Sequence, residues 1–281
     1  MPELPEVETV VRGVRPYLVG RRIRAVEVLN PTVCDFSASE LRGGVVEKVG
    51  RGGKYILLYL ARRTRRPVLV FHLGMTGQLC LISREHPVDQ HTHLVLRLAG
   101  RADELRFRDM RRLGGVCLYD TALELGQRLL EHLGPEADTL TSTDLARVAW
   151  TSSRPIKPLL MDQGKVAGLG NIYTDEALWR ARLHPLRPSH SLSADELREL
   201  ARAIRTVLRR AIRDHGSSVD DFRAPDGSPG RYQDRLAVYG REGEPCPRCG
   251  AIIVRIRIQG RSAHFCPRCQ PAPSSGGSHA D

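Results

Sequence analysis

Four cysteines near the C-terminus constrain the fold of this chain more than any other feature. They are Cys246, Cys249, Cys266 and Cys269, and they follow the spacing C-x2-C-x16-C-x2-C. Two C-x2-C pairs at this separation each place two thiolates on one tetrahedral Zn²⁺ ion. Because four sulfurs fill the coordination sphere, we expect one structural zinc rather than a catalytic one.

The segment between the two cysteine pairs predicts a β-hairpin. Apolar residues alternate with arginines over residues 254–258, and Gln259-Gly260-Arg261 follows as a turn. This alternation gives the hairpin one apolar and one cationic face. Arginines on a folded hairpin suit a DNA backbone. A zinc-binding domain that only stabilises the fold, with its arginines exposed to solvent, would show the same sequence pattern.

The charge balance also favours a polyanionic partner. The chain has 281 residues, with 43 Lys and Arg against 32 Asp and Glu, and a formal net charge of +11. With 41% hydrophobic residues it is globular, and this excess of positive charge favours nucleic acid over a membrane surface. The start of the chain lacks an apolar signal region, and no apolar run is long enough to span a bilayer, so we expect a cytoplasmic protein.

Hydrophobic periodicity divides the chain into a β-rich and a helical part. Residues 3–18 have the spacing of an amphipathic helix. From residue 23 to about residue 120, short β-rich runs are separated by turn residues, which favours a sandwich or barrel. The runs are Ile23–Val28, Val45–Val49, Tyr55–Leu60, Val68–His72, Leu94–Leu98 and Gly115–Tyr119. The middle third is helical, and its longest helix begins with a capping box of Ser193 and Glu196.

The first residues suggest covalent chemistry. Removal of Met1 would leave Pro2 with a free secondary amine, and an α-amine has a pKa of about 7.7–8.0, so part of it is uncharged at neutral pH. Such an amine attacks an aldehyde-like sugar carbon to form a cationic iminium. Glu3 stands beside it as a candidate general acid or base. A simple helix start is the alternative, because Pro and Glu are both favoured in a first turn.

Several glycine-punctuated turns are candidate contacts for phosphate. The segment Gly168-Leu169-Gly170-Asn171 opens a helix whose N-terminus offers free N–H groups. Lys54 follows two glycines at the mouth of a strand, where it can reach a phosphate, although a solvated hairpin turn explains it equally well. The sequence shows no third metal ligand to accompany His91 and His93, so we interpret the pair as a polar contact rather than a metal site.

Together these segments resemble the bacterial formamidopyrimidine-DNA glycosylase (8-oxoguanine DNA glycosylase/AP lyase) family over nearly the whole chain. The matching segments, in order, are Pro2–Glu8, Gly53–Tyr55, His72–Gly77, the histidine pair, Asp109–Gly114, Ile156–Pro158, Leu160–Asp162, Gly168–Tyr173, Tyr239–Arg241 and the four-cysteine finger. The terminus Pro-Glu-Leu-Pro-Glu-Val-Glu joined to a zinc ribbon is the specific part of the match.

The resemblance implies a multidomain α+β fold. We expect an N-terminal catalytic β-sandwich with flanking helices over residues 1–133. A helix–two-turns–helix DNA-binding domain with a lesion-capping loop would cover 134–235, and a zinc-finger β-hairpin 236–270. The last segment, 271–281, would be a disordered tail.

The resemblance also implies residue roles. Pro2 would be the Schiff-base nucleophile and Glu3 an acid/base at the sugar. Lys54 would hold phosphate and assist β-elimination, and Arg261 would grip phosphates and assist δ-elimination. The remaining expected DNA contacts are His91 and Asn171 at the backbone, and Met75, Arg111 and Leu113 in the space left by the extruded base. The loop over residues 217–232 would cover that base.

The implied function is a bifunctional base-excision-repair glycosylase/AP lyase. It would remove 8-oxoguanine and formamidopyrimidines from double-stranded DNA and nick the abasic strand by β,δ-elimination. We expect a monomer in the cytoplasm, associated with the nucleoid. Two alternatives stay open: an endonuclease VIII-like glycosylase for oxidised pyrimidines, and a non-catalytic zinc-ribbon DNA-binding protein.

The chain departs from the family pattern at three places. Leu113 stands where the family usually has Phe, and Met110 stands where it has Pro. The stretch Trp150–Arg154 contains Ser152 and Ser153 in place of a Lys- and Arg-rich segment. These differences bear on DNA affinity and on the preferred opposite base, because an aliphatic wedge stacks less well than an aromatic ring.

Overall fold

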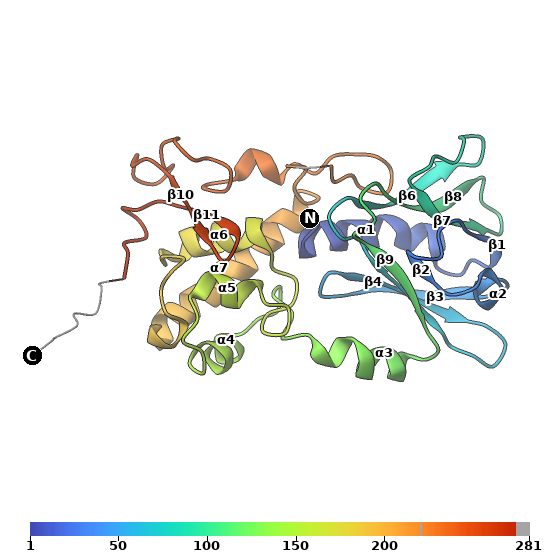
Figure 1. Ribbon diagram of the computed structural model, residues 1–281, viewed down its shortest axis with the longest axis horizontal. Helices are drawn as coiled ribbons and strands as arrows, with labels where there is room; N and C mark the ends of the chain where they lie inside the picture. Colours follow the sequence, from blue (N-terminus) through green and yellow to red (C-terminus); the bar gives the residue numbers. More distant parts are fainter. Residues whose placement is uncertain (220, 274–281) are drawn as a thin grey trace, which may run out of the picture. The chain divides into compact units, whose positions relative to one another are not determined.

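The chain forms two compact units. The computed structural model describes residues 1–219 and 221–273 (Figure 1). One unit comprises Met1–Leu133 with Arg210–Asp234, and the other comprises Gly134–Arg209 with Arg235–Asp281. The segment Arg210–Asp234, which the sequence assigns to the helical domain, thus clusters with the first unit. Most of the expected disordered tail, residues 274–281, lies outside the described residues.

The first unit is a β-sandwich, as the sequence predicts. Its four-stranded sheet has the order β1 (Ile23–Val28), β7 (Thr92–Leu98), β8 (Asp103–Asp109) and β6 (Gly77–Ser83). Its five-stranded sheet has the order β2 (Cys34–Asp35), β9 (Gly115–Tyr119), β5 (Val68–His72), β4 (Tyr55–Ala61) and β3 (Val45–Gly52). All neighbouring strands pair antiparallel except β2 and β9.

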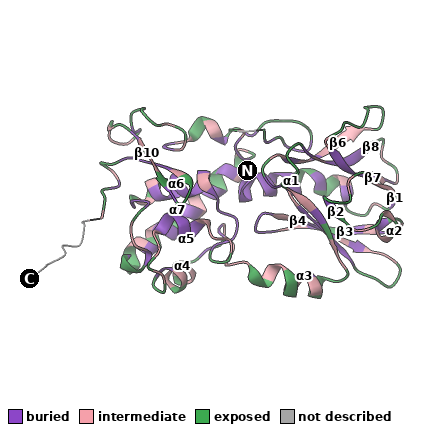
Figure 2. Ribbon diagram, in the orientation of Figure 1, coloured by how far each residue is buried: buried purple, intermediate pink, exposed green. Residues whose placement is uncertain are grey.

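One hydrophobic core joins both sheets to α1 (Leu4–Leu18). Helix α1 packs against β3 and β4, and its buried valines share the core with inward-facing residues of both sheets. The rings of Phe71 in β5 and Phe107 in β8 lie 5.9 Å apart and so connect the two sheets. Helix α3 (Ala122–Arg128) covers part of the other face of the five-stranded sheet, where Leu125 packs near Val68 and Val70. Figure 2 shows the resulting purple interior.

Short elements complete the first unit. Helix α2 (Ala38–Leu41) lies against β1, and the 3-10 turn η1 (Leu130–His132) follows α3.

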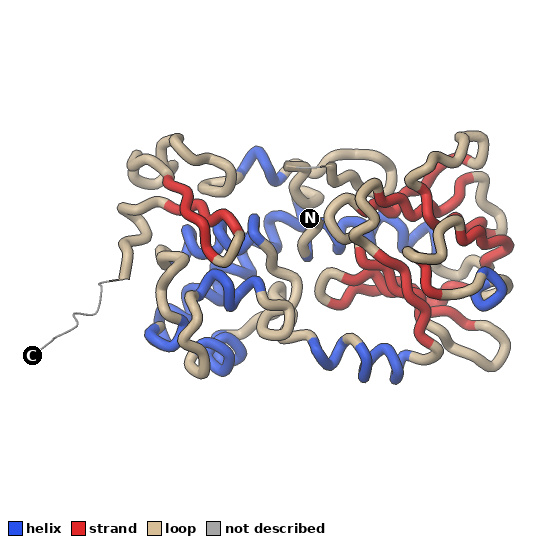
Figure 3. The backbone as a smooth tube through the Cα atoms, in the orientation of Figure 1, coloured by secondary structure: helices blue, strands red, loops and turns tan. Residues whose placement is uncertain are grey.

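The second unit is helical apart from one hairpin (Figure 3). Its helices are α4 (Ser142–Ala149), α5 (Ile156–Met161), α6 (Asn171–Ala181) and most of α7 (Ala194–Arg213), with the 3-10 turn η2 (Ser189–Ser191) before α7. The 3-10 turn η3 (Tyr232–Arg235) spans the point in the sequence where the chain passes from the first unit to the second. The hairpin consists of β10 (Val254–Ile258) and β11 (Arg261–Phe265). A loop over residues 162–170, with a turn at 163–165, joins α5 to α6 at the place expected for the helix–two-turns–helix arrangement.

The capping box expected before α7 is present. The Ser193 backbone N–H donates to Glu196 Oε2 at 2.8 Å, and the Glu196 N–H donates to Ser193 Oγ at 3.2 Å. None of the helices in the described part of the chain is long and apolar enough to cross a membrane.

Replacing Phe107 by Ala should destabilise the sandwich by about 3–5 kcal/mol, because it leaves a cavity between the two sheets. Both tryptophans lie in the second unit, so the effect should be read by hydrogen exchange of the β5 and β8 amides. The control Leu123→Ala removes an apolar side chain that is 69% exposed, and it should change stability by less than about 0.5 kcal/mol. Equal losses from both variants would contradict this account of the core.

Candidate active site and metal centre

The start of α1 is fixed by buried carboxylates. Glu3 and Glu6 are each only 2% exposed, and they form a reciprocal capping box in which the Glu3 N–H donates to Glu6 Oε2 at 2.8 Å. The other oxygen of Glu6 accepts the N–H of Ser217 at 2.7 Å. Pro2, directly before this box, is buried. The capping box therefore fixes the point at which α1 begins, and with it the position of the residues directly before the helix.

The segment after α7 approaches Glu6 closely. Gly216 has a φ of +78°, and a Cβ added there would lie 2.8 Å from Glu6 Oε1. Only glycine tolerates both this backbone conformation and this approach. The lesion-capping loop expected from the sequence thus begins at a fixed contact with α1.

Lys54 lies at the turn between β3 and β4. It follows Gly53, whose φ is +54°, and its side chain is 5% exposed. Burial lowers the pKa of His72, the nearby Lys54 charge lowers it further, and the Asp109 charge opposes both. His72 is therefore neutral at pH 7 and stacks near Tyr55, with ring centroids 5.0 Å apart. Lys54 is thus held in a largely buried position near His72.

Two neighbouring turns of the sandwich expose the expected wedge residues. Met75 lies in the turn from β5 to β6, and Arg111 and Leu113 lie in the turn from β8 to β9. Met75 is 38% exposed and Leu113 is 50% exposed. The guanidinium of Arg111 contacts Met75 Sδ at 3.6 Å, so side chains from the two turns touch.

The two histidines before and within β7 differ in role. His91 is half-buried and its backbone N–H donates to Asp89 Oδ1 at 2.9 Å. Its side chain lines a cavity of about 70 Å³ together with Met110 and Arg108. His93 is 2% exposed, and its Nε2 bonds the carbonyl of Asp109 at 2.8 Å. The pair therefore divides into one accessible and one structural histidine.

In the second unit, Asn171 and Arg261 lie beside the same strand residue. Asn171 is the first residue of α6, and its Nδ2 donates to Ser262 Oγ at 3.2 Å. Its Oδ1 is buried and has no hydrogen-bond partner among the described residues. Gln259 and Gly260 have φ values of +46° and +80°, as a tight two-residue hairpin turn requires. Arg261 follows that turn, and its guanidinium makes no hydrogen bond or ion pair within the described residues.

A buried ionic network, which the sequence reasoning did not identify, holds the hairpin on α5 and α6. Lys157 Nζ donates to Asp175 Oδ1 at 2.6 Å and to the carbonyl of Ser262 at 2.5 Å. Asp175 Oδ2 accepts the backbone N–H of His264 at 2.9 Å. Lys157 and Asp175 are each 1% exposed. No local pattern signals this network, because the partners are far apart in the chain.

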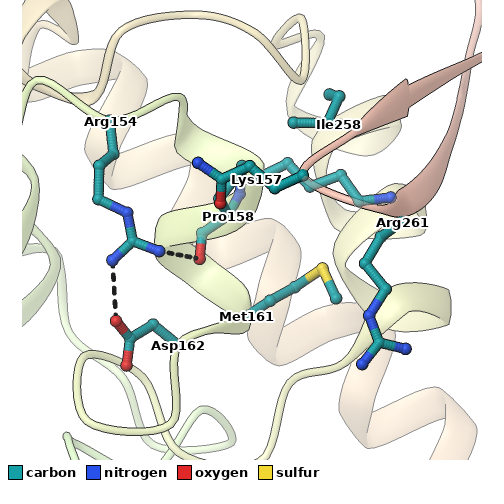
Figure 4. A pocket seen from close by; sticks show the side chains of 8 residues that line it. Arg154, Lys157, Pro158, Met161, Asp162, Ile258 and Arg261 are labelled. Atoms are coloured by element: carbon teal, nitrogen blue, oxygen red, sulfur yellow. Dashed lines mark hydrogen bonds and ion pairs between the residues drawn. The ribbon is translucent and has the colours of Figure 1, made fainter.

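A cavity of about 260 Å³ lies between α5 and the hairpin turn (Figure 4). On one side, Arg154 donates to Asp162 Oδ2 at 2.9 Å and is thereby held away from the hairpin. Arg261 borders the cavity without such a tether. The Arg261 guanidinium is therefore available to an anion.

The four cysteines form a metal centre. Their sulfurs all lie within 4.8 Å of one another, with separations of 3.4 Å for Cys249–Cys266, 3.5 Å for Cys249–Cys269 and 4.0 Å for Cys246–Cys269. A tetrahedral Zn²⁺ with Zn–S bonds of about 2.3 Å requires S···S distances of about 3.8 Å. The residues present therefore fit one structural zinc.

Without a bound cation, the surroundings of the metal centre disfavour the thiolate at Cys269. Burial and the neighbouring thiols raise the pKa of Cys269 to about 12, so a bound cation is needed to hold all four groups deprotonated. The Trp179 indole N–H donates to Cys246 Sγ at 3.4 Å, and Arg248 lies over the Trp179 ring at 4.0 Å. Trp179 therefore ties the finger to α6.

Replacing Cys266 by Ala should release the zinc and unfold the hairpin, because three thiolates close the site poorly and metal affinity is folding energy here. The expected readouts are the loss of one equivalent of metal and a changed fluorescence of Trp179. The control Cys117→Ala, an exposed cysteine of the sandwich, should retain both. Full metal retention by the Cys266 variant would contradict the assignment.

Three family models match the chain in order. Residues 1–116 match the formamidopyrimidine-DNA glycosylase N-terminal domain and residues 133–223 its H2TH domain. Residues 243–272 match the zinc finger found in FPG and IleRS. The sandwich unit carries Pro2, Glu3, Lys54, Met75, His91, Arg111 and Leu113, and the helical unit carries Asn171, Arg261 and the four cysteines.

Curated relatives and solved structures agree with these models. Formamidopyrimidine-DNA glycosylases of Herpetosiphon aurantiacus and Lactiplantibacillus plantarum are 44% and 40% identical, over 91% and 92% of this chain and 94% of theirs. A Lactococcus lactis FPG variant in complex with Fapy-dG DNA has a TM-score of 0.89 at 36% identity, and covers 96% of this chain and 100% of its own. The L. lactis complex with abasic-site DNA has a TM-score of 0.88 at 35% identity with the same coverage. The chain belongs to the formamidopyrimidine-DNA glycosylase family.

Proposed function

We propose that this protein is a bifunctional base-excision-repair glycosylase/AP lyase that removes oxidised purines from double-stranded DNA and then cleaves the abasic strand. The observation that carries the proposal is the fixed, buried start of α1, where Glu6 holds the backbone next to Pro2. Membership of the family supports the glycosylase activity. The L. lactis relative binds both Fapy-dG DNA and abasic-site DNA, which supports the lesion class.

The proposed chemistry begins at Pro2. After removal of Met1, its secondary amine attacks C1′ of the damaged nucleotide and the base leaves. The C1′–O4′ bond of this adduct then breaks, O4′ takes up a proton, and the cationic iminium forms. The iminium acidifies C2′, so that β-elimination expels the 3′-phosphate and δ-elimination then expels the 5′-phosphate. Glu3, adjacent to the amine, exchanges protons with the opening sugar. Its burial holds the carboxylate in one place while it does so.

Cations at several turns are proposed to bind the DNA backbone. Lys54 would hold phosphate at the sandwich and Arg261 at the zinc finger, each presented by a glycine-containing turn. Asn171 is the first residue of α6 and so stands at a helix N-terminus, where N–H groups favour phosphate. His91 would add a further backbone contact. The net charge of +11 makes this binding salt-dependent.

Met75, Arg111 and Leu113 are proposed to fill the gap left by the extruded base. An enzyme that acts on a stacked base must extrude it, at a cost of a few kcal/mol, and apolar or Arg side chains offset part of that cost. Their exposure on two adjacent turns suits this role.

We further propose that the protein acts as a monomer in the cytoplasm at the nucleoid, with the domain division expected from the sequence.

Activity on oxidised pyrimidines is a second candidate function. One structure of the wild-type L. lactis protein, with a TM-score of 0.88 at 36% identity to this chain, contains oxidised-pyrimidine DNA. Because Leu113 is aliphatic, the lesion range and opposite-base preference of this protein can differ from those of relatives with an aromatic wedge.

Blocking Pro2 should abolish activity without changing the fold. A protein expressed with a cleavable extension in place of Met1 has an amide at Pro2, which is no nucleophile, so strand cleavage of abasic DNA should fall at least about 1,000-fold. Proteolysis that leaves Pro2 as the first residue should restore cleavage. A C-terminal extension is the control. Full activity of the extended protein would contradict the assigned nucleophile.

Lesion choice should favour oxidised purines. With duplexes containing 8-oxoguanine or thymine glycol in one sequence context, the rate constant for 8-oxoguanine excision should be higher by about tenfold or more, a difference of about 1.4 kcal/mol in transition-state binding. Single-turnover cleavage on gels measures both rates. Exclusive activity on thymine glycol would support the endonuclease VIII-like alternative, and DNA binding without cleavage would support a non-catalytic role.

A further inference from the structure

We propose that Asp109 is a positioning residue that holds the Met75 turn and the Arg111–Leu113 turn together as one rigid unit. The inference rests on the proposed function, because it explains how those side chains act jointly on duplex DNA. Asp109 ends β8 and is 0% exposed. It touches neither reacting atoms nor, in this proposal, DNA.

Sheet topology brings the two turns side by side. The first turn passes from β5 in one sheet to β6 in the other, and the second passes from β8 back to β9. Because β5 pairs with β9 and β6 pairs with β8, both ends of the two turns are adjacent. The register places His72 opposite Gly115 and Gly77 opposite Asp109. The turns therefore cross between the sheets as neighbours.

The backbones of the turns are in direct contact. Gly74 has a φ of +59°, and a Cβ added there would lie 2.5 Å from Gly114 N and 2.5 Å from Leu113 C. A Cβ on Gly114 would lie 2.5 Å from the carbonyl of His72. Any side chain at Gly74 or Gly114 would push the turns apart. The glycines therefore allow the two backbones to approach this closely, and a further interaction is needed to keep the turns together.

The Asp109 carboxylate supplies that link. Oδ1 accepts from Thr76 Oγ1 at 2.5 Å in the first turn and from Arg111 N at 3.2 Å in the second. Oδ2 accepts from Gly114 N at 2.7 Å. Thr76 Oγ1 also accepts from Arg111 N at 3.2 Å, so one small network spans both turns. A buried carboxylate with three donors is satisfied only in this geometry.

The backbone of Asp109 is fixed independently. Its N–H donates to the carbonyl of His91 at 2.9 Å, and its carbonyl bonds His93 Nε2 at 2.8 Å. The carboxylate is therefore anchored to β7 while it holds the turns. The exposed side chains of Met75, Arg111 and Leu113 radiate from this anchored base, so they are presented to the duplex as a set.

The variant Asp109→Asn tests the proposal. The amide can accept on one side only, so its NH₂ group faces an N–H or O–H donor in either orientation. We expect the rate of 8-oxoguanine excision from duplex DNA to fall roughly 10- to 100-fold, because small misplacements of positioning groups cause losses of this size. Cleavage of a single-stranded abasic oligonucleotide should stay within about twofold, because no stacked base must be extruded and no gap filled.

Two further variants separate positioning from stability. Glu104→Gln alters another buried carboxylate of the same strand, 1% exposed and paired with Arg106, and should lower stability without changing the ratio of duplex to single-strand activity. Thr76→Val removes one hydroxyl from the network and should shift that ratio in the same direction as Asp109→Asn, but less. A 2-aminopurine opposite the lesion should show a smaller fluorescence rise on binding of the Asp109 variant than of the wild type.

Three results would overturn the proposal. One is a parallel fall of both activities in the Asp109 variant, which would indicate general damage to the fold. Another is an unchanged ratio with an unchanged 2-aminopurine signal. The third is a ratio shift of equal size in Glu104→Gln. A wild-type protein that cleaves neither substrate would instead overturn the proposed function itself, and the inference with it.

Discussion

The Glu6 carboxylate is the contact on which the candidate active site depends. It accepts a hydrogen bond from Glu3 at the start of α1 and another from Ser217 after α7. Loss of one hydrogen-bond donor to a buried carboxylate costs about 1–3 kcal/mol. Both segments are therefore held within hydrogen-bond distance of the Glu6 oxygens. The first residues of a chain are usually frayed. Here a buried, hydrogen-bonded carboxyl group and the packed face of α1 fix these residues, which a terminal nucleophile requires.

Buried ionic groups serve a similar purpose elsewhere in the molecule. In the sandwich, Asp109 holds two exposed turns, and in the helical unit Lys157 and Asp175 hold the hairpin that carries Arg261. Glu176 is buried, which raises its pKa, while N–H donors of Ala237, Val238 and Tyr239 favour its charged form. The Asp109 and Lys157–Asp175 networks each support residues proposed to contact DNA. Such networks add rigidity to loops that could otherwise adopt several conformations.

Local sequence patterns predicted the elements with regular periodicity. The valines of α1, the capping box of α7 and the cysteine spacing each follow a rule that acts within a few residues. Strands β6 and β8 were not among the runs singled out. Strand β8 places Leu105 and Phe107 in the core, but it also buries Glu104, Arg106 and Asp109, so its sequence does not form an apolar run. Glu104 and Arg106 pair with each other, but Arg106 also donates to the carbonyls of His86 and Pro87, and Asp109 accepts from Thr76. Local reasoning cannot find these more distant partners.

The same limit applies to the site. Pro2, Glu3 and the zinc ligands could be predicted from the sequence, because the residues that carry their chemistry are adjacent or regularly spaced. The roles of Glu6, Asp109 and Lys157 as supports were missed, because each joins segments that only the folded chain brings together. The family resemblance supplied residue roles at exposed turns but no account of what holds those turns.

The central claim is that the amine of Pro2 forms the covalent intermediate. The most direct measurement is borohydride reduction of the protein during reaction with 8-oxoguanine DNA, followed by proteolysis and mass spectrometry of the crosslinked peptide. The account predicts a single adduct on the N-terminal peptide, at Pro2, in protein that has lost Met1. An adduct on Lys54 or another lysine, or a trapped protein that retains Met1, would contradict it.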